Sequence, residues 1–116
     1  MRARMKMMNE RVVCKDGFTF SCQASETNYC SPRVDRAERY IEVEIGFPDG
    51  VEPLIMPYCE DSENPTETVY GHVPSDLVRH IIDKHGGIAS GEVPKGVPVY
   101  GKTHYNRQLY DEDNSA

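Results

Sequence analysis

The pattern of apolar and polar residues near the start of the chain predicts a β-hairpin. Residues 11–14 and 18–23 are rich in β-branched and aromatic side chains, and they flank Lys15-Asp16-Gly17. An Asp-Gly pair between two such segments is typical of a tight turn, so we expect two short antiparallel strands here. The next segment, "ETNYCSPR", contains asparagine and a Ser-Pro pair, which indicate an irregular loop.

A second alternating segment, "RYIEVEIGF", predicts a half-buried strand. Its period of two places alternate residues on opposite faces of the strand. The residues expected to face the core are Ile41, Val43 and Ile45, and those expected to face water are Tyr40, Glu42 and Glu44. The apolar run "EPLIMPYC" lies between prolines, so we expect at most an edge strand there. The segment "TVYGHVP" alternates again and is expected to return to the sheet, and residues 97–100 are expected to add a last edge strand.

Residues 75–86 carry the pattern of an amphipathic helix. Leucine, valine and isoleucine recur at helical spacing, and polar residues occupy the opposite side. Ser75 is a suitable N-cap, Asp76 lies in the first turn, and Gly86-Gly87 supply a stop signal. We therefore predict an α+β fold: a small, mostly antiparallel sheet of four to five strands with one amphipathic helix packed on it.

The length of 116 residues fits one domain. We expect a flexible basic leader at residues 1–10, a single α+β domain at residues 11–104 and a flexible acidic tail at residues 105–116. The basic start is not followed by an apolar signal region, and nowhere do eighteen apolar residues run together. We therefore expect a cytoplasmic protein that does not bind membranes, with its four cysteines kept as thiols.

Charge is segregated along the chain. Residues 40–78 contain nine carboxylates and no lysine or arginine, whereas the segments before and after carry +3 and 0, so the net charge of −6 arises in the middle third. A surface of one sign attracts partners of opposite sign and repels nucleic acids. This predicts a basic protein partner, in particular a nucleic-acid-binding complex whose groove an acidic face is able to fill, with no direct binding of nucleic acid.

The expected contact residues are carboxylates of the second alternating segment and of the loop "EDSENPTE", with tyrosines as anchors at their border. They are Glu42, Glu44, Glu60, Asp61, Glu63, Glu67, Tyr40, Tyr58 and Tyr70. The alternative is an acidic surface that serves solubility alone. Residues 54–56 form an exposed edge in this scheme, which leaves a homodimer open.

Metal and catalytic sites find little support in the sequence. The four cysteines Cys14, Cys22, Cys30 and Cys59 lack the close spacing of zinc sites, and His72 is the histidine that would complete a Cys₃His set. Cys30, near Arg33, is the best candidate for a nucleophile, but no catalytic cysteine signature surrounds it. The loop "EDSENPTE" lacks the calcium-binding register. We expect no enzyme activity, no metal and no cofactor; a small cysteine-dependent or zinc enzyme is the third hypothesis, which metal analysis and Cys30→Ala would test.

A small-ligand site is the alternative function. The segment "HGGIASGEVPKG" contains four glycines and a lysine, and its backbone N–H groups are able to bind a nucleotide or signalling molecule. Glycine directly after a helix, however, is first of all a C-cap. The sequence thus leaves a binding or sequestering role at residues 86–96 as the second hypothesis.

Three segments together resemble small proteins carried by tailed bacteriophages: "CQASETNYCSPR", "YIEVEIGFPDG" and "ENPTETVYGHVPSDLVRHIIDKHGGI". Those proteins have no assigned reaction, so no site residues carry over. The resemblance implies an accessory protein made in the cytoplasm of a bacterial host. By analogy of class, it implies a stoichiometric inhibitor of a host defence system, of the anti-CRISPR type that mimics nucleic acid.

Overall fold

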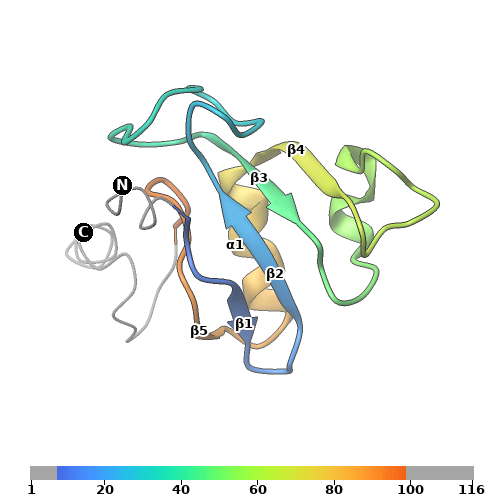
Figure 1. Cartoon of the computed structure of the whole chain (residues 1–116). Coiled ribbons are helices and arrows are strands. Elements are labelled where there is room, and N and C mark those ends of the chain that lie inside the picture. Colours follow the sequence, from blue (N-terminus) through green and yellow to red (C-terminus); the bar gives the residue numbers. More distant parts are fainter. Residues whose placement is uncertain (1–7, 99–116) are drawn as a thin grey trace.

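A computed structural model describes residues 8–98 and shows an antiparallel five-stranded sheet in the order β4-β3-β2-β1-β5, with helix α1 packed across one face (Figure 1). This confirms the predicted α+β fold. The strands are β1 (Val12–Cys14), β2 (Thr19–Gln23), β3 (Glu42–Gly46), β4 (Val69–Pro74) and β5 (Ile88–Ser90). The helices are the 3-10 helix η2 (Pro53–Tyr58) and α1 (Ser75–Lys84).

The predicted hairpin is present as β1 and β2, which pair with Val12 opposite Phe20. Gly17 adopts φ +98° in the turn, a conformation that glycine tolerates best. Asp16 stabilises the turn because its carboxylate accepts the Phe18 N–H at 2.9 Å. The sequence signal was therefore sufficient here, since the turn and both strands are local.

Strand β3 confirms the predicted alternation at Val43 and Ile45, which are fully buried, but the alternation fails at its start. Ile41 is 62% exposed, whereas Tyr40 is only 4% exposed. The strand begins at Glu42, and before it the chain bonds elsewhere: Tyr40 N–H donates to Lys95 O and Ile41 N–H to Ser31 O. These contacts turn the aromatic ring inward, which periodicity alone does not reveal.

The first expected edge strand is not formed. The segment "EPLIMPYC" forms η2 because Pro53 fixes its first turn and the Glu52 carboxylate caps it, accepting the Leu54 N–H at 2.9 Å. Of the described residues, the last that form a strand are those of β5; Val97 is buried outside any strand, and residues 99–100 of the expected strand at residues 97–100 lie outside the described part of the chain. Strand β4 lies beside β3 as expected.

Helix α1 buries Val78, Ile81 and Ile82 against the sheet, as the helical pattern predicts. Ser75 is not its N-cap. Pro74 occupies that position, and the Ser75 hydroxyl instead donates to Tyr40 O at 2.7 Å, which joins the helix to the start of β3. The helix ends before Gly86 and Gly87, both at positive φ.

The expected leader falls largely in residues 1–7, and the expected tail falls wholly in residues 99–116, so these predictions lie outside the described residues. Within residues 8–98, no helix is long and apolar enough to cross a membrane.

Candidate acidic binding face

Two of the predicted contact residues, Glu42 and Glu44, lie on the face of β3 opposite its buried valine and isoleucine. Glu42 Oε1 is 2.8 Å from Nδ1 of His72 on β4. Glu44 accepts hydrogen bonds from Asn28 Nδ2 at 2.8 Å and from the Tyr29 N–H at 3.3 Å. The sheet therefore fixes both carboxylates, and the loop before β3 folds back over them.

Tyr29 is the centre of this face, although the charge pattern of the sequence does not point to it. Its backbone carbonyl accepts the His72 N–H at 3.0 Å, and its side chain covers Gly71 of β4. A Cβ on Gly71 would lie 3.1 Å from Tyr29 Cβ and 3.7 Å from Glu60 Oε2, so Glu60 reaches the same place. Glu44 and Glu60 thus lie near Tyr29, and Glu42 is linked to it through His72, whose ring centroid is 6.4 Å from that of Tyr29. Tyr29 is 42% exposed.

The loop between Glu60 and Glu67 forms a series of turns held by its own polar groups. Asp61 accepts the Glu63 N–H at 3.2 Å and the Asn64 side-chain amide at 3.0 Å. Glu60, Asp61, Glu63 and Glu67 are all exposed. Among the described residues, no lysine, arginine or histidine forms an ion pair with any of these four carboxylates. Within residues 8–98, the loop therefore presents negative charge that is not paired with a cation.

Positive charge does reach the sheet face from outside the acidic segment. The Arg33 guanidinium lies 5.1 Å from the centroid of the Tyr29 ring, and its Nε donates to Glu26 O. His72 pairs with Glu42. The charge separation seen along the sequence is therefore only partial in space, and among residues 8–98 the loop after η2 is a part without a paired cation.

The tyrosine predictions need correction. Tyr40 and Tyr70 belong to the core: their hydroxyls donate to Val34 O at 2.7 Å and to Pro65 O at 2.6 Å. Neither ring is able to anchor a partner at the surface. Tyr58 is half-buried and packs against the core. A tyrosine, with a polar hydroxyl on a large apolar ring, suits both the core and an exposed interface, so the sequence could not distinguish buried from exposed tyrosines.

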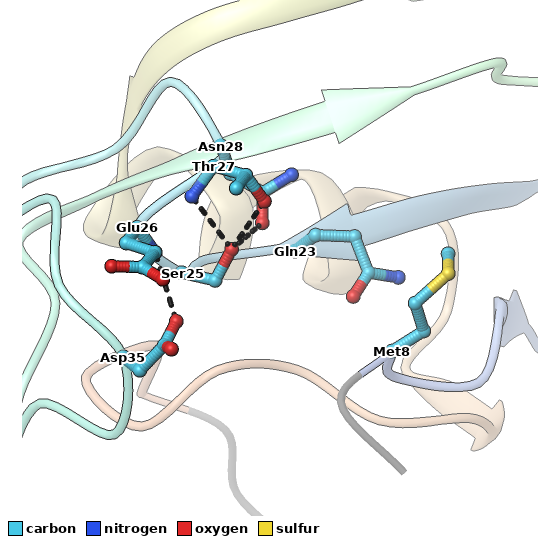
Figure 2. Close-up of a pocket in the computed structure, with 7 residues that line it drawn as sticks. All are labelled: Met8, Gln23, Ser25, Glu26, Thr27, Asn28 and Asp35. Carbon is cyan, nitrogen blue, oxygen red and sulfur yellow. Dashed lines mark hydrogen bonds between the residues drawn. The ribbon is translucent and has the colours of Figure 1, made fainter. Parts of the chain in front are cut away.

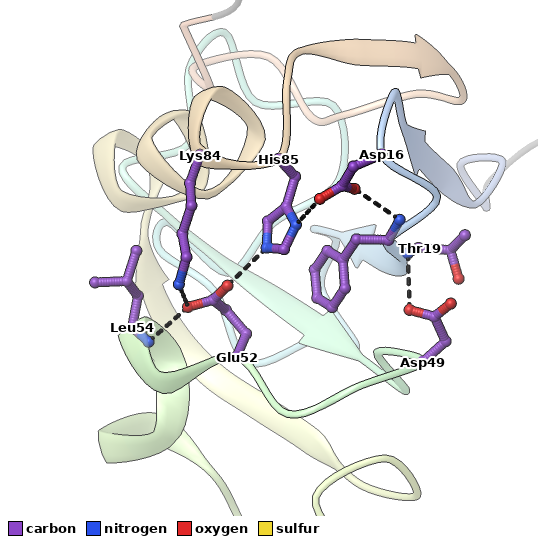
Figure 3. Close-up of polar contacts among 8 residues, drawn as sticks. Asp16, Thr19, Asp49, Glu52, Leu54, Lys84 and His85 are labelled. Atoms are coloured by element: carbon purple, nitrogen blue, oxygen red, sulfur yellow. Dashed lines mark hydrogen bonds and ion pairs between the residues drawn. The ribbon is translucent and has the colours of Figure 1, made fainter.

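The structure also removes one carboxylate from the acidic surface. Glu52 is only 1% exposed and is bound to Lys84 and His85 at the end of α1 (Figure 3). Burial raises the pKa of its carboxyl group, but Lys84, the Leu54 N–H and His85 outweigh this and hold that pKa below its usual value. Glu52 is thus a structural anion and contributes little to a binding face.

The cysteines occupy separate positions in the fold. Cys14, Cys22 and Cys30 are buried and Cys59 is half-buried, and all are free thiols. Burial, with smaller effects from Asp16 and Asp49, raises the pKa of Cys14 to about 12, and burial also raises the pKa of Cys22 and Cys30. In residues 8–98, no three His, Cys, Asp or Glu side chains meet in a geometry suited to a metal ion.

The glycines after α1 serve close packing. A Cβ on Gly96 would lie 2.7 Å from Tyr40 N, and one on Gly91 would lie 2.6 Å from Val12 Cα. Lys15 packs over Gly87 and donates its backbone N–H to Gly87 O. The expectation of a ligand cradle at residues 86–96 therefore gains no geometric support.

A hollow of about 400 Å³ lies elsewhere, between the loop after β2 and the chain before β1 (Figure 2). The Ser25 hydroxyl faces Thr27 and Asn28, and Asp35 accepts the Glu26 N–H at 3.0 Å. Most of these polar groups already bond to one another. The full lining is Met8, Gln23, Ser25, Glu26, Thr27, Asn28 and Asp35.

In comparisons with known proteins, no protein-family model, curated protein or solved structure matches the chain.

Proposed function

We propose that this protein binds a basic protein partner through an acidic binding face formed by Glu42, Glu44 and Glu60 around Tyr29 and by the adjoining loop at residues 60–67. The observation that carries the proposal is the exposed loop, whose four carboxylates have no cationic partner among the described residues. Carboxylates on a folded loop form charge-assisted hydrogen bonds with arginine and lysine.

The physical behaviour of such a face follows from its two parts. The exposed loop accelerates encounter with a basic surface by electrostatic steering, an effect that salt screens within about 8 Å at physiological ionic strength. Tyr29 supplies an aromatic contact of the kind that interfaces favour. Arg33 of this chain already lies over the Tyr29 ring, so an arginine of the partner is able to pair with the carboxylates near Tyr29.

The concrete version of the proposal is a stoichiometric, phage-type inhibitor that blocks a nucleic-acid-handling defence complex, as an anti-CRISPR protein does. Its support is the charge argument together with the resemblance described above. An acidic face that occupies a basic groove excludes nucleic acid from it without catalysis. In this view the protein needs no cofactor, and one copy inactivates one target.

The test is affinity capture by the tagged protein from a lysate of CRISPR-bearing bacteria, at low and then high salt, followed by mass spectrometry. Glu63→Lys alters the exposed loop, and Glu38→Lys is the matched control because it makes the same charge change at an exposed site outside the face. We expect a basic nucleic-acid-binding protein to be retained by wild type and Glu38→Lys. Glu63→Lys should no longer capture this protein, and neither should wild type at high salt. Capture that is unchanged by the Glu63→Lys substitution and by high salt would contradict the proposal.

The hollow beside Ser25 supports a second candidate function, the binding of a small polar ligand. Its two carboxylates, Glu26 and Asp35, favour a cationic amine over an anionic nucleotide. A ligand that binds only the folded state raises the melting temperature. A thermal-shift panel of polyamines and nucleotides therefore tests this function, and a panel without any shift would exclude the compounds that it contains.

A further inference from the structure

His85, the residue directly after α1, lies between two carboxylates that come from distant parts of the chain (Figure 3). Its Nδ1 is 2.7 Å from Asp16 Oδ2 in the β1–β2 turn, and its Nε2 is 2.7 Å from Glu52 Oε1 before η2. The Phe18 ring stacks on the imidazole, with 4.2 Å between centroids and planes 16° apart. The ring is thereby fixed in orientation, and both of its nitrogens face an acid.

The two contacts determine the protonation state of the ring. Ionised carboxylates only accept hydrogen bonds, whereas a neutral imidazole has a single N–H to donate. Only the imidazolium satisfies both contacts. Burial lowers the His85 pKa, but the hydrogen bonds to Glu52 and Asp16 outweigh it and raise that pKa above its ordinary value. The Phe18 N–H and His85 in turn lower the pKa of Asp16, so the acids stay ionised.

The surrounding charges fit this state. Lys84 Nζ is 2.8 Å from the second oxygen of Glu52, so two cations face the buried carboxylate. The Lys15 side chain lies over Gly87, close to His85 in the chain, and the Asp49 carboxylate accepts a hydrogen bond from the Thr19 N–H. The carbonyl end of α1 itself favours a cation at its last turn.

The same contacts join three separate segments. Lys15 N–H donates to Gly87 O at 2.9 Å and Asp16 N–H to His85 O at 3.2 Å, which ties the hairpin turn to the end of α1. Glu52 caps η2 through the Leu54 N–H. His85 connects the two, because it is the residue that touches both acids.

We propose that His85 is a pH-sensitive clamp that holds the β1–β2 turn, the end of α1 and the start of η2 together as long as its ring is protonated. Loss of the proton leaves a lone pair against one carboxylate and removes one of the two connections. Either loss loosens the junction of the β1–β2 turn, the end of α1 and the start of η2, so the clamp links pH to the order of that junction.

The direction of the effect follows from linkage. The folded state binds the His85 proton more tightly than the unfolded chain does, so the clamp contributes fully below the unfolded pKa of about 6.5. Its contribution is then lost as pH rises through the higher folded pKa. Stability from this group therefore falls on going from weakly acidic to alkaline pH.

The experiment measures unfolding by urea across this pH range for wild type, His85→Gln and His80→Gln. His80 is an exposed histidine on the same helix and serves as the matched control. We expect the difference in stability between wild type and His85→Gln to shrink steadily above neutral pH, whereas His80→Gln keeps the wild-type profile. A difference that stays constant with pH would overturn the proposal.

A titration of wild type by NMR keeps the proposal testable even if His85→Gln does not fold. The His85 ring signals should titrate above the ordinary histidine value of about 6.5, and Asp16→Asn should move the His85 midpoint downward. Amide protection of Phe18 and Leu54, corrected for intrinsic exchange, should fall through the same midpoint. A His85 midpoint at the value of an exposed histidine would refute the clamp.

Discussion

Glu42 and His72 pair across neighbouring strands, with 2.8 Å between Oε1 and Nδ1, although their side chains are 36% and 52% exposed. His72 holds this position at φ +54°, in an irregularity of the β3–β4 pairing. The pair therefore places a carboxylate on the acidic binding face without burying it, which distinguishes it from the buried Glu52.

The first prediction is that Glu42→Gln leaves the fold intact. Exposed pairs of this kind contribute about 0 to 1 kcal/mol, so the free energy of unfolding should change by less than about 1 kcal/mol. Urea unfolding measures this value. A loss several times larger would show that the pair supports the fold, and charge variants at Glu42 would then be unsuitable for binding assays.

The second prediction concerns Glu52, whose carboxylate is buried and fully bonded. Glu52→Ala removes the η2 cap and leaves Lys84 and His85 without their shared acid. Breaking a buried ion pair by removing one partner costs about 3 to 5 kcal/mol, and the exposure of Lys84 places this case near the lower value. Urea unfolding should therefore show a loss of about 3 kcal/mol.

The control for Glu52→Ala is Glu63→Ala, which removes the same group from the exposed loop. Its free energy of unfolding should stay within about 0.5 kcal/mol of wild type, as is usual for surface positions. Equal losses in the two variants would contradict the structural role assigned to Glu52.

The third prediction is a graded effect of alanine at three glycines. Gly50 has open space around it, so Gly50→Ala should be near neutral. Gly17 also has open space but adopts φ +98°, and Gly17→Ala should cost about 1 to 2 kcal/mol. Gly91 combines φ +105° with backbone of Arg11 and Val12 against its Cα, so Gly91→Ala should cost more than either.

Melting temperatures of the three glycine variants test this order. The comparison separates backbone strain from steric overlap, because Gly17 has only the first and Gly91 has both. If Gly91→Ala melted above Gly17→Ala, the close approach of residue 91 to β1 would be wrong.

The fourth prediction is selective alkylation. Cys59 is half-buried, whereas Cys14 and Cys22 are at most 1% exposed and burial raises the pKa of both thiols. Only the thiolate reacts at an appreciable rate. Iodoacetamide should therefore modify Cys59 first in the native protein, and modify Cys14 and Cys22 only after unfolding, as peptide mass spectrometry would reveal. Rapid native modification of Cys22 would contradict its position in the core.

Local signals in the sequence predicted much of the fold. Asp16-Gly17 marked the hairpin, the period at Val43 and Ile45 marked β3, and the apolar stripe with two following glycines marked α1. Each of these depends on residues that are neighbours along one element, so a single segment contains the whole signal. The same is true of the net negative charge of the middle third.

Longer-range contacts decided the remainder. Tyr40 is buried and Ile41 is exposed because the backbone before β3 forms hydrogen bonds with Ser31 and Lys95. The alternation of apolar and polar residues does not indicate these distant contacts. The segment after Glu52 became a 3-10 helix through a cap whose carboxylate also serves His85.

The sequence by itself determined the α+β class, most strands, the helix and the sign of the charge. Only the tertiary structure decided which charges meet. It placed Arg33 over Tyr29, buried Glu52 between Lys84 and His85, and left the loop at residues 60–67 exposed. The physical reason is that secondary structure follows from local backbone and hydrophobic preferences, whereas the environment of an ionisable group depends on distant segments that fold against it.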